Sequence, residues 1–364
     1  MKLQNLCAFA LKQNELPAPL WLGYNVSQNL GGLMPSNYQE NLLWDLHEKM
    51  FLIRMVEERI KVEYASRRIR GPVHLSIGQE AAAVGVLHAC LQSDVCVSTH
   101  RNHAHYLAKG GSLDGMVDEL FGLTTGCCKG YGGSMHLMDL NANLILSSAI
   151  LAGSIPIASG IAFALKKDGA NRVCVGFLGD GATDEGVFFE TLNLAALMKL
   201  PLLFVVENNA ISTMTTFAKR QAVPDVIGKA ERFGVNGKTV DGNDVIGVYH
   251  AAQEIVEGMR QTREPFVLET VTDRLCAHVG PIIYPNGIGA DDSLQGRWMR
   301  EPMLILNEKI KSEYPDQLEA YLARQHDLRD YVDQEFLRGA QRFDADALRL
   351  QLPAAPPAQD VRRV

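Results

Sequence analysis

The stretch that decides the fold is GDGATDEGVFFETLNLAALMKLPLLFVVENN, residues 179–209. The apolar run just before it, residues 173–178, predicts a buried strand. Residues 184–199 then predict a helix, because acids occupy its first turn and Lys199 its last, as the helix dipole favours. After Pro201, the apolar run 202–206 predicts a second strand. A strand–helix–strand unit implies two parallel strands joined by a right-handed crossover.

Polar and small residues follow both of these predicted strands. Ligands of open parallel sheets bind beyond the carboxyl ends of the strands, and here the ends are Gly179-Asp180-Gly181 and Asn209. Asp and Asn oxygens are ligands that Mg²⁺ accepts, and small residues such as Gly181 and Ala182 let backbone N–H groups approach an anion. A lone Gly-Asp-Gly is usually only a tight turn. Its pairing with Asn209, about thirty residues later, favours a magnesium and diphosphate site.

The rest of the chain adds helices and one more strand to this unit. Apolar periodicity and flanking Gly and Pro residues predict helices at 39–68, 78–91 and 302–350 and a strand at 265–272. The many Gly residues of 110–133 predict that much of this segment is loop. We therefore predict an α/β protein with a parallel sheet flanked by helices. Its expected divisions are an irregular extension at 1–40, the diphosphate-binding α/β domain at 41–300, and C-terminal helices with a frayed tail at 301–364.

Composition excludes several classes of protein. The 364 residues are 47% hydrophobic and 21% charged, which argues against a disordered or fibrous chain, and the net charge of -7 argues against a nucleic-acid surface. Seven cysteines without framework spacing, and no secretory signal, suggest a cytoplasmic protein. Residues 140–165 are uncharged and long enough to span a bilayer, but their Ser, Asn, Gly and Pro residues favour burial against protein or ligand. We expect no membrane segment.

Beyond this motif, the chain resembles a known family from about residue 39 to 292. It is similar to the alpha subunit of the thiamine-diphosphate-dependent first component of 2-oxo acid dehydrogenase complexes, of the pyruvate, acetoin and branched-chain type. The likeness rests on residues 179–209 and on HLSIGQEAAAVG (74–85), THRNHAHYLAKG (99–110), GCCKGYGGSMH (126–136) and VDGNDV (240–245). It is strongest to acetoin dehydrogenase around residues 99–138. The resemblance implies the thiamine-diphosphate-binding fold.

The resemblance also implies roles for individual residues. Asp180, Asn209 and the backbone carbonyl of Ile211 would hold Mg²⁺. The expected cofactor contacts are Gly179, Gly181 and Ala182 at the diphosphate, Ala149 and Leu151 at the aminopyrimidine ring, and His100, Arg101 and His278 elsewhere on the cofactor. His74 and His278 match active-site histidines of the family.

The histidines allow a second interpretation, and two positions depart from the family. His100, His103 and His105, with Cys127 and Cys128 downstream, are compatible with zinc, although their spacing fits no common structural finger. The alternative is a polar pocket in which histidine moves protons near neutral pH. His100 stands where the family has Tyr. The loop at 275–281 has Val279 where animal members carry a phosphorylated Ser, so that mode of control is not implied.

An alpha subunit of this family does not act alone. The Glu that activates the cofactor belongs to a beta chain, so the resemblance implies an α2β2 heterotetramer, with residues 126–165 as the expected interface. The expected reaction is oxidative decarboxylation of a 2-oxo acid, or acetoin cleavage, with acyl transfer to a lipoyl acyltransferase. The alternative within the fold is a thiamine-diphosphate-dependent decarboxylase or carboligase without a lipoyl partner. A non-catalytic scaffold fits less well, because the candidate site residues are all present. A nicotinamide-dependent enzyme also fits less well, because no Gly-x-Gly-x-x-Gly opens a helix after the first strand of this chain.

Overall fold

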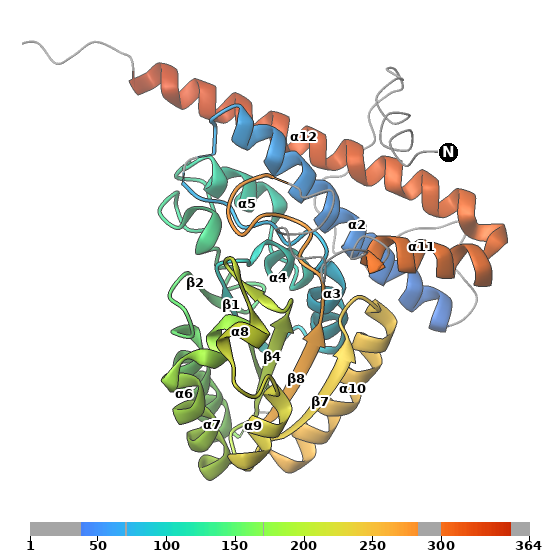
Figure 1. Ribbon diagram of the computed structural model, residues 1–364. Helices are drawn as coiled ribbons and strands as arrows, with labels where there is room; N and C mark the ends of the chain where they lie inside the picture. Colours follow the sequence, from blue (N-terminus) through green and yellow to red (C-terminus); the bar gives the residue numbers. More distant parts are fainter. Residues whose placement is uncertain (1–37, 70, 170, 283–299, 351–364) are drawn as a thin grey trace, which may run out of the picture. The chain divides into compact units, whose positions relative to one another are not determined.

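A parallel sheet forms the centre of the computed structural model, which describes residues 38–69, 71–169, 171–282 and 300–350. Within this part, the main sheet has the strand order β2-β1-β3-β4-β8-β7 (Figure 1). Its strands are β1 (Val95–Thr99), β2 (Leu144–Ser148), β3 (Cys174–Gly179), β4 (Leu202–Asn208), β7 (Asn236–Asp241) and β8 (Phe266–Val271). All five strand pairings are parallel, so the carboxyl ends meet at one edge. The predicted fold class is confirmed.

Both faces of the central strands are buried, which explains their unbroken apolar runs. Side chains alternate along a strand, so neighbours in β4 enter different cores. Leu203 and Val205 belong to one core cluster, whereas Leu202 and Phe204 belong to the other. The predicted strands at 173–178, 202–206 and 265–272 correspond to β3, β4 and β8.

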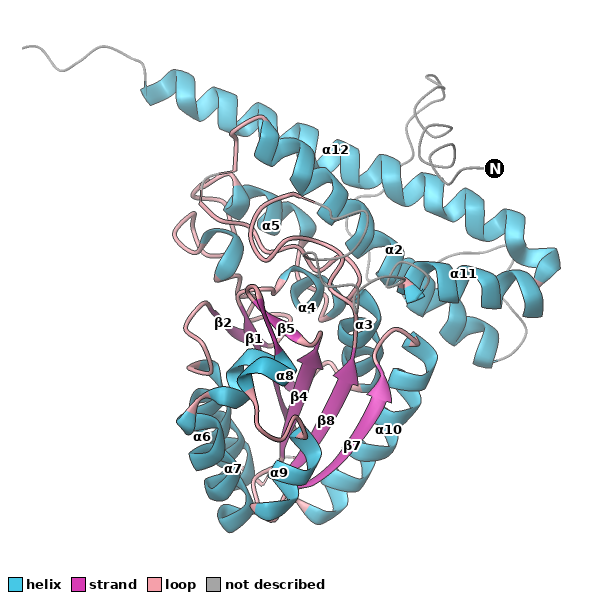
Figure 2. Cartoon of the chain, viewed as in Figure 1, coloured by secondary structure: helices cyan, strands magenta, loops and turns pink. Residues whose placement is uncertain are grey.

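Helices cover the two faces (Figure 2). On one face α6 (Ser154–Lys167) packs against β1 and β3, and α7 (Gly186–Met198) packs beside it. On the other face α10 (Val245–Thr262) packs against α3 (Glu80–Ala89) and contacts β7 and β8. The remaining helices of six residues or more are α2 (Tyr38–Ala65), α4 (His103–Ala108), α5 (Leu113–Leu120), α9 (Val226–Arg232), α11 (Pro302–Glu313) and α12 (Leu318–Leu350).

The chain divides into two units by contacts, Met1–Asn41 and Leu42–Val364, and the whole sheet belongs to the second. The predicted irregular extension at 1–40 lies outside the described residues up to position 37, and α2 begins at Tyr38. The predicted frayed tail from residue 353 lies entirely outside them. Inside the second unit, α2 and α12 meet where the rings of Trp44 and Tyr321 stack at 3.8 Å.

Two segments contain elements that the sequence does not reveal. Much of 110–133 is loop, as expected, but Ser112 accepts a hydrogen bond from the Gly115 N–H and begins α5. Residues 140–165 contain two elements. They form β2 and most of α6, joined by a turn with a positive φ at Ala152. Within the described residues, no helix has the length and apolar character needed to cross a membrane.

Candidate active site

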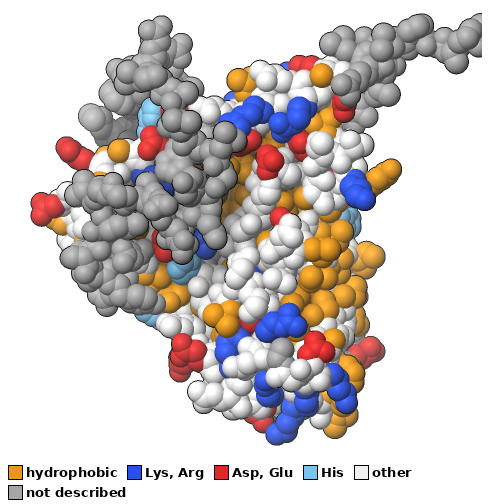
Figure 3. All heavy atoms as spheres, turned by 180° about the vertical axis from the view of Figure 1, so that it is seen from behind, with side chains coloured by type: hydrophobic (Ala, Val, Ile, Leu, Met, Phe, Trp, Pro, Cys, Tyr) orange, Lys and Arg blue, Asp and Glu red, His pale blue; other side chains and the backbone are white. Residues whose placement is uncertain are grey.

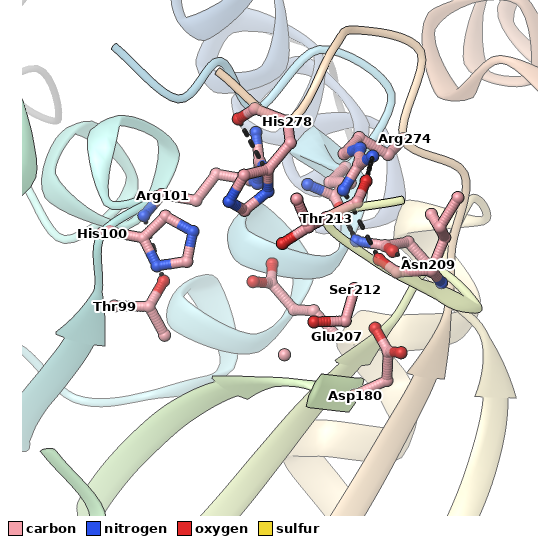
Figure 4. A pocket seen from close by; sticks show the side chains of 13 residues that line it. Thr99, His100, Arg101, Asp180, Glu207, Asn209, Ser212, Thr213, Arg274 and His278 are labelled. Atoms are coloured by element: carbon pink, nitrogen blue, oxygen red, sulfur yellow. Dashed lines mark hydrogen bonds between the residues drawn. The ribbon is translucent and has the colours of Figure 1, made fainter. Parts of the chain in front are cut away.

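A small cavity of about 60 Å³ lies at the carboxyl edge of the sheet. Four neighbouring strands lead into it, because the order β1-β3-β4-β8 is continuous in the sheet. Its lining residues are Gln79, Thr99, His100, Arg101, Gly179, Asp180, Glu207, Asn209, Ile211, Ser212, Thr213, Arg274 and His278. The close view shows these side chains converging from separate strand ends (Figure 4). The structure thus brings Asp180, Asn209, His100, Arg101 and His278 together, as the sequence predicts.

Asp180 is the buried acid of this cavity. It follows β3, whose last residue Gly179 pairs with Glu207 of β4, and only 2% of Asp180 is exposed. Burial raises the pKa of its carboxyl group to about 6, although the guanidinium of Arg220 opposes that rise. Arg220, at the end of the short helix α8 (Phe217–Arg220), donates hydrogen bonds to both Asp180 and Asp184. The buried carboxylate is therefore held by a cation of the chain itself.

Asn209 faces the same cavity, and its side chain is held by hydrogen bonds to Gln79 and Ile211. Its Nδ2 donates to Gln79 Oε1 at 2.8 Å, which turns its Oδ1 the other way, and Oδ1 accepts the Ile211 N–H at 3.2 Å. An amide oxygen such as Oδ1 is a ligand type that Mg²⁺ accepts. Gln79 is buried, and its Nε2 has no hydrogen-bond partner among the described residues. An unpaired buried donor lining a cavity is suited to an anionic ligand.

The loop after β4 and the turn after β3 lie close together at the cavity. Arg274 donates to the carbonyl oxygens of Ile211 at 3.4 Å and Thr213 at 3.0 Å, so it fixes the loop after β4. A side chain at Gly181 would place its Cβ 2.5 Å from Ser212 Oγ, which explains why this position is small. Ala182 is buried beside it in the single 3₁₀ turn η3 (Asp180–Asp184). The Ser212 side chain therefore lies directly against the backbone of η3 at Gly181.

Three histidines gather on the opposite side of the cavity. The rings of His74, His100 and His278 lie edge to face, with centroids 4.5, 5.1 and 5.5 Å apart. Burial lowers the pKa of His74 to about 2, of His100 to about 3 and of His278 to about 4. Charge repulsion adds to each shift, first from His100 at His74 and first from Arg101 at His100 and His278. All three rings are therefore neutral at physiological pH.

Arg101 lines the cavity, and its guanidinium donates hydrogen bonds to backbone carbonyl oxygens. It donates to the carbonyl oxygens of Leu75 and of His278, the second at 3.4 Å. Because Leu75 and His278 belong to different segments, Arg101 joins the histidine-bearing loop after β8 to the one before α3. Its contact with a diphosphate stays a prediction.

The zinc arrangement considered above is not formed. His103 pairs with Glu57 at 3.0 Å and Ser134 at 2.8 Å, and both of its ring nitrogens are used. His105 likewise pairs with Ser98 at 2.7 Å and Glu207 at 3.2 Å. These contacts direct the two side chains away from His100, so the three do not share one ligand.

Two predicted contacts lie outside the cavity. Ala149 and Leu151 follow β2 at the carboxyl edge, where both are exposed, and neither lines the cavity. β2 is an edge strand, separated from β3 by β1. The proposed contact of Ala149 and Leu151 with the aminopyrimidine ring therefore stays a prediction.

The donor set fits a cation bridged to a diphosphate. Asp180 and Asn209 supply the oxygen ligands that Mg²⁺ prefers, and Gln79, which lines the same cavity, has a buried side-chain Nε2 without a partner among the described residues. A parallel sheet with such residues at its carboxyl edge defines an α/β enzyme that binds an anionic cofactor there. Within that class, the family model for "Dehydrogenase E1 component" matches residues 48–280, and the chain belongs to this family. Membership implies thiamine diphosphate as the cofactor.

Several curated relatives are similar over most of the chain. The alpha subunit of acetoin:2,6-dichlorophenolindophenol oxidoreductase from Bacillus subtilis is 41% identical over 240 residues, which cover 66% of this chain and 72% of that protein. The same subunit from Cupriavidus necator has equal identity and coverage. The pyruvate dehydrogenase E1 component subunit alpha of Porphyra purpurea is 37% identical over 281 residues, 75% of this chain and 81% of that one.

Sequence reasoning missed several residues of the site. Gln79, Glu207, Arg274 and Arg220 were not singled out, although each touches the cavity or its acid. Glu207 carries a detectable signal, since an acid immediately before Asn208-Asn209 ends an otherwise apolar strand. Arg220 carries none, because only the folded α8 places it beside Asp180.

Proposed function

We propose that this chain is the alpha subunit of a thiamine-diphosphate- and Mg²⁺-dependent dehydrogenase that acts on a 2-oxo acid or on acetoin. The observation that supports this most strongly is the convergence of Asp180 and Asn209 in one buried cavity at adjacent strand ends. Asp180 and Asn209 would hold Mg²⁺, with the carbonyl oxygen of Ile211 as a further ligand. Thiamine diphosphate, when bound, supplies the electron sink that permits loss of CO₂ or cleavage of an acyloin bond.

The chain's own residues bind and orient the ligands in this proposal. The Gln79 amide and the backbone N–H groups of Gly181 and Ala182 would donate to diphosphate oxygens. His74 and His278, neutral and facing each other, would accept or donate single protons near the substrate. The Arg101 guanidinium donates to the backbone carbonyl oxygen of His278 and so holds this histidine in place.

A beta subunit is part of the proposal, because relatives of this chain are named as alpha subunits. An exposed apolar surface, made of Ile157 and Phe163 of α6 and Leu194, Leu197 and Met198 of α7, suits such a partner. Figure 3 shows orange side chains gathered on this side of the molecule. Tyr131, Leu140 and Ile150, within the predicted interface 126–165, are exposed as well. We propose an α2β2 heterotetramer that passes its acyl group to a lipoyl acyltransferase.

The test is co-expression of the chain with the product of the neighbouring gene, followed by a substrate panel. Pyruvate, branched-chain 2-oxo acids and acetoin would be assayed with 2,6-dichlorophenolindophenol as electron acceptor. We expect turnover only with both chains, thiamine diphosphate and Mg²⁺, and none in the Asp180→Asn complex. Tight cofactor binding and turnover by the isolated chain would contradict the proposal.

The same substrate panel distinguishes the proposed dehydrogenase from the alternative, a decarboxylase or carboligase without a lipoyl partner. A decarboxylase or carboligase would release aldehyde or acyloin without any electron acceptor. The names of the curated relatives, all oxidoreductase or dehydrogenase subunits, do not favour that alternative.

A further inference from the structure

Cys127 and Cys128 form a pair of adjacent thiols in the glycine-rich loop that follows α5. Their sulfur atoms lie 3.9 Å apart, and both side chains are partly exposed. Neither residue lines the cavity at the carboxyl edge of the sheet. The pair therefore lies outside the chemistry assigned to that cavity.

A hydrogen bond between the two thiols makes them unequal. The Cys127 S–H donates to the Cys128 sulfur, which lowers the pKa of Cys128 and raises that of Cys127. The thiolate is the nucleophile in cysteine chemistry, so Cys128 is the thiol that we expect to react first. Cys127 is then close enough to react with the product of that first step.

The other cysteines that the structure describes are poor nucleophiles. Cys96, Cys174 and Cys276 are buried, and burial raises the pKa of each thiol. Burial of the Cys90 thiol likewise raises its pKa to about 12. Among the described cysteines, an oxidant that needs a thiolate is therefore directed to Cys128.

We propose that Cys127 and Cys128 form a reversible oxidation site, at which a peroxide converts the two thiols to a disulfide between adjacent residues. The Cys128 thiolate attacks one oxygen of hydrogen peroxide, the O–O bond breaks, and the departing hydroxide takes up a proton and leaves as water. The Cys127 sulfur then attacks the sulfenic acid on Cys128, which forms the S–S bond and releases a second water. Two thiols and one peroxide thus give one disulfide and two waters. This site does not depend on the proposed function.

The geometry of adjacent residues makes such a disulfide strained and therefore easily reduced. Neighbouring α-carbons are about 3.8 Å apart, which is below the range of about 4.4–6.8 Å that is usual for disulfides. The two sulfurs must also move from 3.9 Å to about 2.05 Å apart. A strained disulfide has a higher reduction potential, so cellular dithiols can reverse the reaction.

Oxidation also changes the loop, because the backbone of both cysteines is held by hydrogen bonds. The Cys128 N–H donates to a Glu119 oxygen at 2.8 Å, and the Cys127 N–H donates to the carbonyl oxygen of Gly115 at 3.0 Å. Closing the disulfide twists the peptide unit between the two cysteines and strains both bonds. We therefore expect the backbone to loosen at the next residue, Lys129, which already has a positive φ of 60°.

A metal site is the alternative use of these thiols. Glu119, Cys127 and Cys128 offer ligand atoms that lie within 4.8 Å of one another. However, each of the two Glu119 oxygens already accepts two backbone N–H groups of the loop. With the carboxylate engaged, two thiols remain, which is fewer than the four ligands of structural zinc sites. The contacts therefore favour oxidation over metal binding.

The test oxidises the reduced full-length chain with a small excess of hydrogen peroxide and then blocks free thiols with iodoacetamide. Complete tryptic digestion releases the peptide 110–129, whose only cysteines are Cys127 and Cys128. We expect this peptide to be lighter by two hydrogen atoms, to escape alkylation, and to be alkylated twice after treatment with dithiothreitol. A peptide that stays doubly alkylated after peroxide, or that carries only sulfinic acid, would overturn the proposal.

Single variants, checked for folding by circular dichroism, separate the roles of the two thiols. In Cys127→Ser, a sulfenic acid should accumulate on Cys128 and be trapped by dimedone. Cys128→Ser should react at least about tenfold more slowly, because burial still raises the pKa of its remaining thiol. Cys90→Ser is the matched control and should form the disulfide at the wild-type rate. Equal oxidation rates in Cys127→Ser and Cys128→Ser would overturn the proposal.

Limited trypsin digestion of the native chain measures the change in the loop. Cleavage after Lys129 should be several-fold faster in the oxidised chain than in the reduced chain, and should return to the reduced rate after dithiothreitol. Peroxide should leave the cleavage rate of Cys128→Ser unchanged. If the disulfide forms and cleavage after Lys129 does not change, the inferred effect on the loop is wrong.

Discussion

The carboxylate of Asp180 is paired with the guanidinium of Arg220, so the proposed Mg²⁺ ligand already has a cation beside it. Arg220 also pairs with Asp184, and its guanidinium carbon lies 5.4 Å from the centre of the Phe217 ring. The contact joins α8 to the turn after β3. Cation binding at Asp180 and the position of α8 are therefore linked.

We expect Arg220→Gln to bind Mg²⁺ several-fold more tightly at saturating thiamine diphosphate, because it removes a competing positive charge. The same change should lower the free energy of unfolding of the unloaded chain by about 2–3 kcal/mol, since a largely buried ion pair is broken. Calorimetric Mg²⁺ titration and urea unfolding measure the two effects. Lys219→Gln, an exposed neighbour on α8, is the matched control. Weaker Mg²⁺ binding in Arg220→Gln would contradict competition.

The raised pKa of Asp180 predicts how Mg²⁺ binding depends on pH. Below its pKa of about 6 the carboxyl group is protonated, and a proton must leave before the ion binds. The Mg²⁺ concentration for half-saturation should therefore rise about tenfold per pH unit below 6 and stay nearly constant above 7. A profile that is flat down to pH 5 would show that this carboxylate is not the ligand.

The raised pKa of Asp180 also predicts that its contribution to the free energy of unfolding decreases as the pH rises, whereas most acids contribute more at higher pH. The folded-state pKa lies above the ordinary value of 3.8, so the contribution of Asp180 is fully present below pH 3.8 and is lost as pH rises towards 6. Relative to Asp180→Asn, the wild-type free energy of unfolding should fall by about 2 kcal/mol between pH 4 and pH 7. Urea unfolding of the two Mg²⁺-free proteins measures this difference.

Glu119 organises the glycine-rich loop that follows α5. Its two oxygens accept the N–H groups of Cys128, Gly130, Gly132 and Gly133 at 2.7–2.9 Å. Glu119→Gln replaces one acceptor with a donor and leaves two of these N–H groups unpaired, so we expect a loss of about 2–4 kcal/mol in unfolding free energy. Faster proteolysis within 126–133 should accompany it. Exposed Glu257→Gln should change stability by less than about 0.5 kcal/mol.

The apolar surface on α6 and α7 predicts where the beta subunit binds. Leu197 is 76% exposed there, and Leu197→Glu should abolish co-purification with the beta chain without lowering the melting temperature of the isolated alpha chain. Leu322→Glu, at an exposed position on α12, is the matched control and should leave the complex intact. If Leu197→Glu co-purifies as well as the control does, the interface lies elsewhere.

Much of the central sheet can be predicted from the sequence, because β3 and β4 are largely apolar runs bounded by Gly, Pro and Asn, and β8 begins with Phe-Val-Leu directly after Pro265. The outer strands are harder to predict. β7 has the sequence Asn-Gly-Lys-Thr-Val-Asp and lies at an edge, so it lacks the apolar signal that both-sided burial imposes. β2 lies within the long uncharged stretch 140–165. The Pro and Gly residues of this stretch indicate that an element ends there, but not whether that element is a helix or a strand.

Some residues of the site can likewise be predicted from the sequence, and others cannot. Asp180 and Asn209 are predictable because the strand–helix–strand unit fixes their separation in space. Gln79 and Arg220 are not, since their places depend on how α3 and α8 pack against other elements. The histidines are intermediate. Clustering in the sequence suggests a polar pocket, but only the fold separates His103 and His105, which serve the core, from His100.

Each wall of the cavity is carried on a different ribbon of the sheet, with His100 after β1, Asp180 after β3, Asn209 after β4 and His278 after β8. A substitution in one of these connections changes one side of the cavity and leaves the strands of the sheet in place. His100, which stands where the related family has Tyr, is a change of this kind. The architecture favours diversification by piecemeal replacement.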